Sequence, residues 1–142
     1  ENEIMDHEML YLLLRDKSEE AIRALMEPEV LTIPARFEEE QIARPQQTGP
    51  VFSITPNGKL HMRYTMRKRN VIWSQNKTTA AALALLTQIL ESDSHYLFHS
   101  RLKPGMGFIS NNVLHNRSSF QDTPAHIRHI YRARYYDSIA ET

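Results

Sequence analysis

Apolar residues recur along this chain at two spacings, one typical of helices and one typical of strands. The longest helical pattern predicts a helix over Ala80–Glu91, capped by Thr78 or Thr79. Asp6 and Ser18 have N-cap chemistry and each precedes a shorter apolar stripe, which predicts two further helices near the start of the chain. The stripe of the long helix is expected to bury Leu83, Leu86 and Leu90 and to expose Thr87 and Glu91.

Alternating apolar and polar positions predict several strands. The clearest pair flanks Asn57-Gly58 and predicts a hairpin over Val51–Tyr64. Val30–Phe37 is predicted to be a strand interrupted at Pro34, and the polar segment Glu38–Gly49 is predicted to be a loop. The remaining strands are expected at Glu3–Met5, His95–Leu102, Met106–Ser110, Val113–Phe120 and Ile127–Tyr136.

Strands outnumber helices in this pattern, and the last elements alternate between strand and turn. This order is typical of a mainly β protein with flanking helices, arranged as a double-stranded β-helix, or jelly roll. A chain of 142 residues has the length of a single domain. It begins at Glu1 with neither an initiator methionine nor a leader-like segment, so we expect a fragment or a processed product. The family resemblance described below implies that residues 1–142 are the C-terminal portion of a jelly roll.

Composition narrows the function classes. The formal net charge is zero, which gives no general attraction to nucleic acid or to anionic lipid. No apolar run approaches membrane-spanning length, so we expect no membrane partner and a cytoplasmic protein. The absence of cysteine excludes disulfides and thiolate metal ligands, and it leaves seven histidines as candidate ligands or bases.

The candidate chemistry lies in the last third of the chain. A turn at Gln121–Pro124 would place His115 opposite Arg128, and both side chains would then share one face of a hairpin. A slip of one residue would reverse every face. Imidazole suits ferrous iron and guanidinium binds a carboxylate through two hydrogen bonds, yet periodicity alone favours a structural histidine and a solvated row of arginines.

The motifs around His115 carry a family resemblance. Leu114-His115-Asn116-Arg117, then Phe120, then Arg128 and Arg132, resembles a His-Gly-Arg motif followed by an aromatic residue and a late Arg-x-x-x-Arg. The preceding segment, Pro104 to Asn112, is similar to the strand that leads to this motif. The family is the taurine dioxygenase-like group of Fe(II)/2-oxoglutarate oxygenases, and its glutarate-hydroxylase branch is the most similar. The resemblance spans about residues 51–137.

The resemblance implies a set of roles. It implies hydroxylation of a small-molecule substrate with Fe(II) and 2-oxoglutarate, His115 being the distal iron ligand. Arg128 would receive the distal carboxylate of 2-oxoglutarate, and Arg132 would be the second arginine, which meets substrate or cosubstrate. Whether Arg134 also makes such a contact stays open on the sequence. Asn116 stands where the family has glycine. The proximal His-x-Asp/Glu ligand pair is absent from these 142 residues, and we expect it to lie upstream of Glu1.

Two other functions remain open on the sequence. The first is a non-catalytic jelly-roll module that retains an anion pocket at Arg128 and Arg132. The second is a nucleic-acid patch formed by Arg63, Arg67, Lys68 and Arg69, although zero net charge favours a solvated strand end there. We therefore expect a small-molecule partner and no nucleic acid, and the sequence is compatible with a homo-oligomer.

Overall fold

The computed structural model describes residues 1–39, 41–67, 69–125, 127–133, 135 and 139, and Lys68 and Arg134 therefore lie outside the described residues. The helices in chain order are α1 His7–Lys17, α2 Glu19–Leu25 and α3 Lys77–Leu90. The strands are β1 Asn2–Asp6, β2 Leu31–Ile33, β3 Arg36–Glu38, β4 Gln41–Arg44, β5 Gln47–Gly49, β6 Phe52–Ile54, β7 Leu60–Met62, β8 Ile72–Trp73, β9 Phe98–Ser100 and β10 Val113–Arg117.

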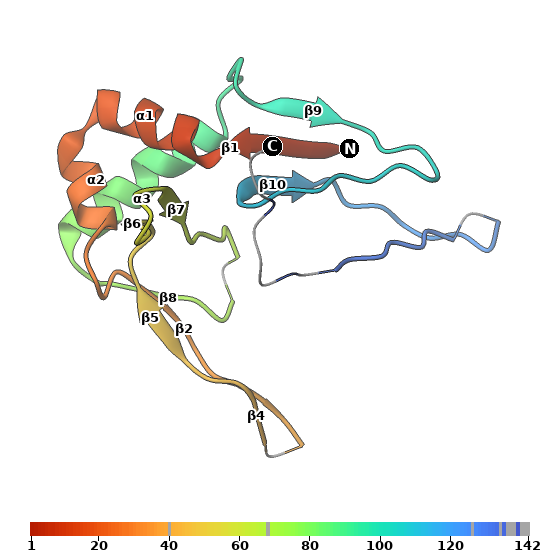
Figure 1. Ribbon diagram of the computed structural model, residues 1–142, viewed down its shortest axis with the longest axis horizontal. Helices are drawn as coiled ribbons and strands as arrows, with labels where there is room; N and C mark the ends of the chain where they lie inside the picture. The colour runs from red at the N-terminus through yellow and green to blue at the C-terminus, as the bar shows by residue number, and fades with distance from the viewer. Residues whose placement is uncertain (40, 68, 126, 134, 136–138, 140–142) are drawn as a thin grey trace.

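The described strands form small antiparallel sheets, so the protein is rich in β-structure and has helices at its side. One sheet has the order β10-β1-β9 and another the order β5-β2-β8, while β3–β4 and β6–β7 are two-stranded. In Figure 1 the helices pack together at one end, and the sheet of β1, β9 and β10 extends from them. None of the described helices combines the length and the apolar character needed to cross a bilayer.

Most of the core lies between the three helices and the strands beside them. It contains large side chains that are fully out of contact with water, among them Met5 of β1, Leu14 of α1, Phe52 of β6 and Leu86 of α3. The ring of Tyr11 meets the ring of Phe52 edge to face, with ring centres 5.4 Å apart. This arrangement anchors β1 against the helices, and β1 in turn carries β9 and β10.

The N-terminal predictions are largely confirmed because they depend on local chemistry. Asp6 Oδ1 accepts hydrogen bonds from the backbone N–H groups of Glu8 (2.7 Å) and Met9 (3.3 Å), and so caps α1. Ser18 Oγ accepts from the N–H of Ala21 at 3.1 Å and caps α2. The hairpin of β6 and β7 also forms, and Gly58 has the positive φ of +81° that its turn requires.

The long helix forms with two differences. It begins at Lys77, and its N-cap is Asn76, whose side-chain oxygen accepts from the N–H of Thr79. Leu86 is fully buried, whereas Leu83 and Leu90 are only partly buried, because the buried stripe runs through Thr79, Ala82, Leu86 and Ile89. Glu91 is exposed as predicted, but Thr87 is half-buried, where its side chain hydrogen-bonds with Tyr64.

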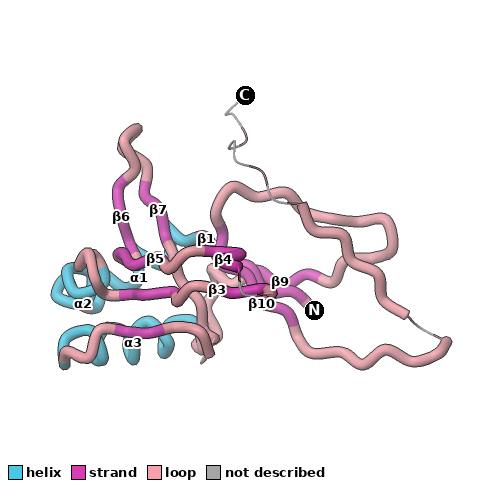
Figure 2. The backbone as a smooth tube through the Cα atoms, turned by 90° about the horizontal axis from the view of Figure 1, so that it is seen from below, coloured by secondary structure: helices cyan, strands magenta, loops and turns pink. Residues whose placement is uncertain are grey.

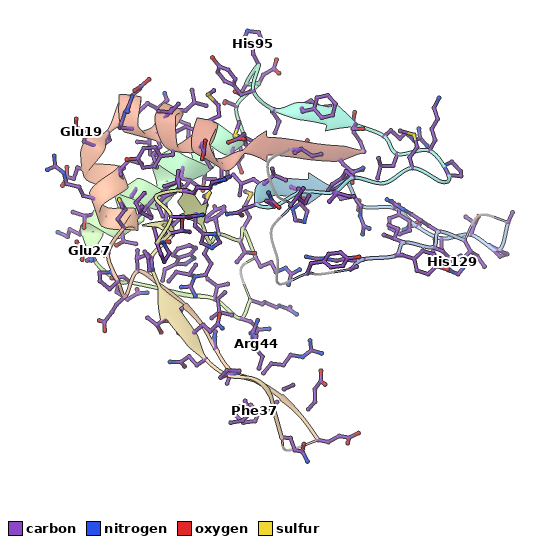
Figure 3. All side chains as sticks on the ribbon, viewed as in Figure 1. Glu19, Glu27, Phe37, Arg44, His95 and His129 are labelled. Carbon is purple, nitrogen blue, oxygen red and sulfur yellow. The ribbon has the colours of Figure 1, made fainter. Side chains whose placement is uncertain are left out.

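The polar segment predicted to be a loop is instead part of a projecting arm. β3 and β4 pair antiparallel within it, and β5 returns to the body beside β2. Figure 2 shows the backbone of these strands, and Figure 3 places Phe37 and Arg44 on the arm, away from the helices. Phe37 lies opposite Ile42 across the arm, and both are exposed. The prediction was wrong because hydrogen bonds between neighbouring strands can form without an apolar face.

The predicted strands of the last third form only in part. Val113–Arg117 is a strand, shorter than the predicted Val113–Phe120, whereas residues 106–110 and the described residues 127–133 have no strand structure. The predicted hairpin between 113–120 and 127–136 is therefore wrong in the described residues. β10 pairs instead with β1, more than a hundred positions earlier in the chain.

Candidate functional site

Strand β10 displays its side chains on two faces, and the packing of the fold determines which face is which. β10 is antiparallel to β1, with Leu114 opposite Met5 and His115 opposite Ile4. Met5 is buried in the core, and Leu114 packs against that core. Because successive side chains on a strand alternate, His115 and Arg117 point to the other face, away from the core.

His115 is exposed on this outer face, and its ring is oriented by its own strand. The ring Nδ1 lies 3.3 Å from the backbone oxygen of Val113. A carbonyl oxygen only accepts hydrogen bonds, so Nδ1 is the donor in this contact, and Nε2 has no hydrogen-bond partner among the described residues. Ile4 lies beside His115 on the central strand, and Phe98 lies beside Ile4 on β9. An imidazole whose Nδ1 is bonded to a carbonyl and whose Nε2 is free has the arrangement of a metal ligand.

Arg128 reaches the region of β10 without forming a strand. Its guanidinium carbon lies 4.5 Å from the centre of the Phe120 ring, and that of Arg117 lies 4.9 Å from the same centre. The backbone N–H of Arg128 donates to Asp122 Oδ1 at 3.0 Å, which ties the returning segment to the bend after β10. The structure thus brings Arg128 to the Phe120 ring, which Arg117 also contacts, and not into a strand register with His115.

The other predicted residues of this segment are exposed. Arg132 is exposed, and so are His129 and Tyr131, which a strand would turn to the opposite face. Figure 3 shows His129 on the extended C-terminal segment, far from the helices. Without a partner strand, the alternation of faces that the predicted hairpin required does not arise.

The metal-ligand set is incomplete in the part of the chain that the structure describes. No group of three or more histidine, cysteine, aspartate or glutamate side chains lies close enough there to hold a metal ion. His115 therefore supplies one candidate ligand of the three that a two-histidine, one-carboxylate site needs.

An amide links the hairpin of β6 and β7 to the start of β10, a contact that no sequence pattern predicted. Asn112 Nδ2 lies 3.0 Å from His61 Nδ1 and 3.4 Å from the backbone oxygen of Met62. Because the amide nitrogen only donates, His61 must be neutral at Nδ1 to accept this bond. The contact fixes the residue that precedes the strand carrying His115.

Arg63 is a structural residue and not part of a solvated basic cluster. Its guanidinium donates to the backbone oxygens of Leu31 (2.6 Å), Gly49 (3.0 Å) and Gln47 (3.4 Å). These bonds join the base of the arm to the hairpin of β6 and β7. Burial lowers the pKa of Arg63. The sequence signal for this structural role was the position of Arg63 between Met62 and Tyr64 in a strand with alternating apolar and polar residues.

The His61–Asn112 contact predicts a pH-dependent stability. Partial burial, His7 and Arg63 together lower the pKa of His61 below its ordinary value of 6.5. The unfolded chain then binds a proton before the folded one, so the free energy of unfolding should fall as the pH drops below about 6.5. Urea unfolding between pH 7.5 and 5 should show this decline, and it should be smaller in His61→Gln. The same decline in His61→Gln and wild type would contradict the prediction; His95→Gln, on an exposed loop, is the matched control.

Comparison with known proteins indicates an oxygenase. The chain is similar to a dioxygenase, and this similarity supports oxidoreductase chemistry of that broad class. The relative is the uridine-5'-phosphate dioxygenase of Amycolatopsis sp, which is 30% identical over 130 residues. The match covers 88% of this chain and 46% of the relative, so the chain spans about half the length of the curated relative it matches. No protein-family model matches the chain, and no solved structure matches it.

Proposed function

We propose that this chain is the C-terminal portion of an Fe(II)/2-oxoglutarate-dependent dioxygenase that hydroxylates a small molecule. The observation that carries the proposal is the similarity to a dioxygenase over 88% of the chain. The resemblance of the His115 and Arg128 motifs to the taurine dioxygenase-like group supports the same reaction class and names its metal and cosubstrate. Within this group, the proposal assigns the protein to the glutarate-hydroxylase branch.

In this proposal His115 is the distal iron ligand. Its exposed ring, its Nδ1 contact with the Val113 carbonyl and its free Nε2 fit that role, since metal-binding histidines commonly donate their other N–H to a carbonyl. Bound iron would supply the activation of oxygen that accompanies oxidation of 2-oxoglutarate to succinate. The two further ligands would come from the proximal His-x-Asp/Glu pair, in sequence outside this chain.

Arg128 would bind the distal carboxylate of 2-oxoglutarate. A guanidinium offers two parallel N–H groups to a carboxylate. The guanidinium carbon of Arg128 lies 4.5 Å from the centre of the Phe120 ring, which holds the group in place. Arg132 lies four residues after Arg128 on the same segment and is exposed, so it would meet substrate or cosubstrate. Together these side chains would orient the cosubstrate relative to His115.

We further propose that β1, β9 and β10 belong to an incomplete jelly roll. β10 lies at the edge of its sheet, and an open edge can pair with another strand. Apolar side chains are exposed around this sheet and in the segment after it, including Phe98, Ile109, Ile130 and Tyr131. A second sheet, carried by the part of the protein outside this chain, would cover them. The same surface would also serve a homo-oligomer.

One observation favours a second candidate, a non-catalytic jelly-roll module with an anion pocket. The described residues hold two arginines against the Phe120 ring but no set of three metal ligands. Such a module would bind 2-oxoglutarate or a similar anion and would not turn it over.

Succinate formation separates the two candidates. The full-length protein, supplied with Fe(II), 2-oxoglutarate, oxygen and uridine-5'-phosphate, should produce succinate, measured by proton NMR. The isolated 142-residue chain should bind metal weakly and give no turnover, because it holds too few ligands. If the full-length protein binds 2-oxoglutarate without iron-dependent succinate formation, the non-catalytic module is correct.

A further inference from the structure

Two arginines from separate segments share one aromatic ring. Arg117 ends β10, Arg128 follows the loop after it, and their guanidinium carbons lie 4.9 Å and 4.5 Å from the Phe120 ring centre. A cation over an aromatic face is held by the ring's electron density. Phe120 therefore helps to position both guanidiniums.

The charge of this pair is uncompensated in the described part of the chain. The ion pairs found there involve Arg15, Arg23 and Arg36, and none involves Arg117 or Arg128. Asp122 is the nearby carboxylate, and its Oδ1 accepts from the backbone N–H of Arg128. A guanidinium without a carboxylate partner can bind an anion through its N–H groups.

Arg117 also has a defined position relative to the candidate metal ligand. It lies two residues after His115 on the same face of β10, which separates the two Cα atoms by about 6.5–7 Å along the strand. Arg128 enters from the other segment. An anion bound at Arg117 would therefore lie near His115.

From this arrangement we infer that Arg117 binds a phosphate monoester on the primary substrate, beside the carboxylate held by Arg128. The roles of Arg128 and His115 in this inference rest on the proposed function, whereas the contact between Arg117 and a phosphate can be tested separately. A phosphate monoester carries a charge near −2 at neutral pH and accepts the paired N–H groups of a guanidinium. Its charge attracts the guanidinium of Arg117 more strongly than the single charge of a carboxylate does. The relative that this chain resembles is named for a nucleoside monophosphate.

Calorimetry on the full-length protein tests the phosphate site, with uridine-5'-phosphate, uridine and inorganic phosphate as probes. Wild type should bind uridine-5'-phosphate more tightly than uridine. Arg117→Ala should weaken uridine-5'-phosphate by on the order of tenfold to a hundredfold and leave the affinities for uridine and 2-oxoglutarate unchanged. Arg117→Lys should restore part of the loss, since it keeps the charge without the fork. Arg101→Ala, an exposed arginine just after β9, is the matched control and should bind like wild type.

A second variant tests the role of the ring. Phe120→Leu removes the surface that holds both guanidiniums, so it should weaken both uridine-5'-phosphate and 2-oxoglutarate, while Arg117→Ala weakens only the former. Unfolding curves of the variants should overlay that of wild type. If Phe120→Leu left both affinities unchanged, the ring would have no positioning role.

The outcomes separate this inference from the proposed function. Unchanged uridine-5'-phosphate binding in Arg117→Ala would overturn the phosphate site even if the protein forms succinate. Equal losses for uridine and uridine-5'-phosphate would overturn it too, because the phosphate would not be the group recognised. A selective loss in Arg117→Ala, in a protein that neither binds 2-oxoglutarate nor forms succinate, would support the phosphate site and overturn the oxygenase.

Discussion

Replacing His115 with alanine in the full-length protein is expected to abolish iron-dependent succinate formation while the fold stays intact. Losing a residue that only orients a metal ligand already costs about 10–100-fold in metal affinity or activity, so losing the ligand itself should cost more than about a hundredfold. The side chain is exposed and its hydrogen bond goes to the backbone of its own strand, so its removal leaves the core untouched. Succinate is measured by NMR, and iron binding by metal analysis after gel filtration.

A matched control comes from the same sheet. His99 lies on β9 and is exposed, so His99→Ala changes an equivalent histidine outside the candidate site. It should keep the turnover of wild type. Undiminished turnover in His115→Ala would remove His115 from the metal site, and parallel losses in both variants would indicate general damage to the sheet instead.

Replacing Arg128 with alanine is expected to weaken 2-oxoglutarate binding by on the order of tenfold to a hundredfold or more. A hydrogen bond to a charged group contributes roughly 1.5–3 kcal/mol, and this arginine would make two of them to one carboxylate. Arg128→Lys should recover only part of the affinity, because an ammonium cannot present the paired N–H groups. Calorimetry on the full-length protein measures both variants.

A control variant is needed to show that the effect comes from the guanidinium of Arg128 and not from a change in the loop that carries it. Arg128 also donates its backbone N–H to Asp122, and that bond survives the change to alanine. Arg132→Ala removes a neighbouring exposed charge and should have a smaller effect. If Arg128→Ala kept the wild-type affinity and Arg132→Ala lost it, the carboxylate would belong to Arg132.

The structure also separates two uses of arginine that look alike in the sequence. Arg63 and Arg117 both lie at the ends of short strands. The guanidinium of Arg63 is partly buried and satisfies three backbone oxygens, whereas that of Arg117 is exposed over an aromatic ring. Arg117 can therefore bind a ligand more readily than Arg63, because Nη1 and Nη2 of Arg63 already donate to backbone oxygens.

The sequence alone determined the features that depend on neighbours along the chain. Asp6 and Ser18 start their helices because a side-chain oxygen meets backbone N–H groups two or three residues later. The Asn57-Gly58 turn formed because glycine adopts the positive φ that a tight hairpin needs. The family resemblance likewise depends only on the order and spacing of His115, Phe120 and Arg128 along the chain.

Only the tertiary structure decided which strand β10 pairs with. Alternation shows that Val113–Arg117 can be a strand, but it does not say whether its partner is the next segment or β1. β10 pairs with β1 because this pairing places Leu114 opposite Met5, where Leu114 packs against the core. The same pairing turned His115 and Arg117 to the outer face and left Arg128 to return over Phe120. Burial of apolar side chains that are far apart in the sequence therefore determined where His115, Arg117 and Arg128 lie, and no local pattern encodes that placement.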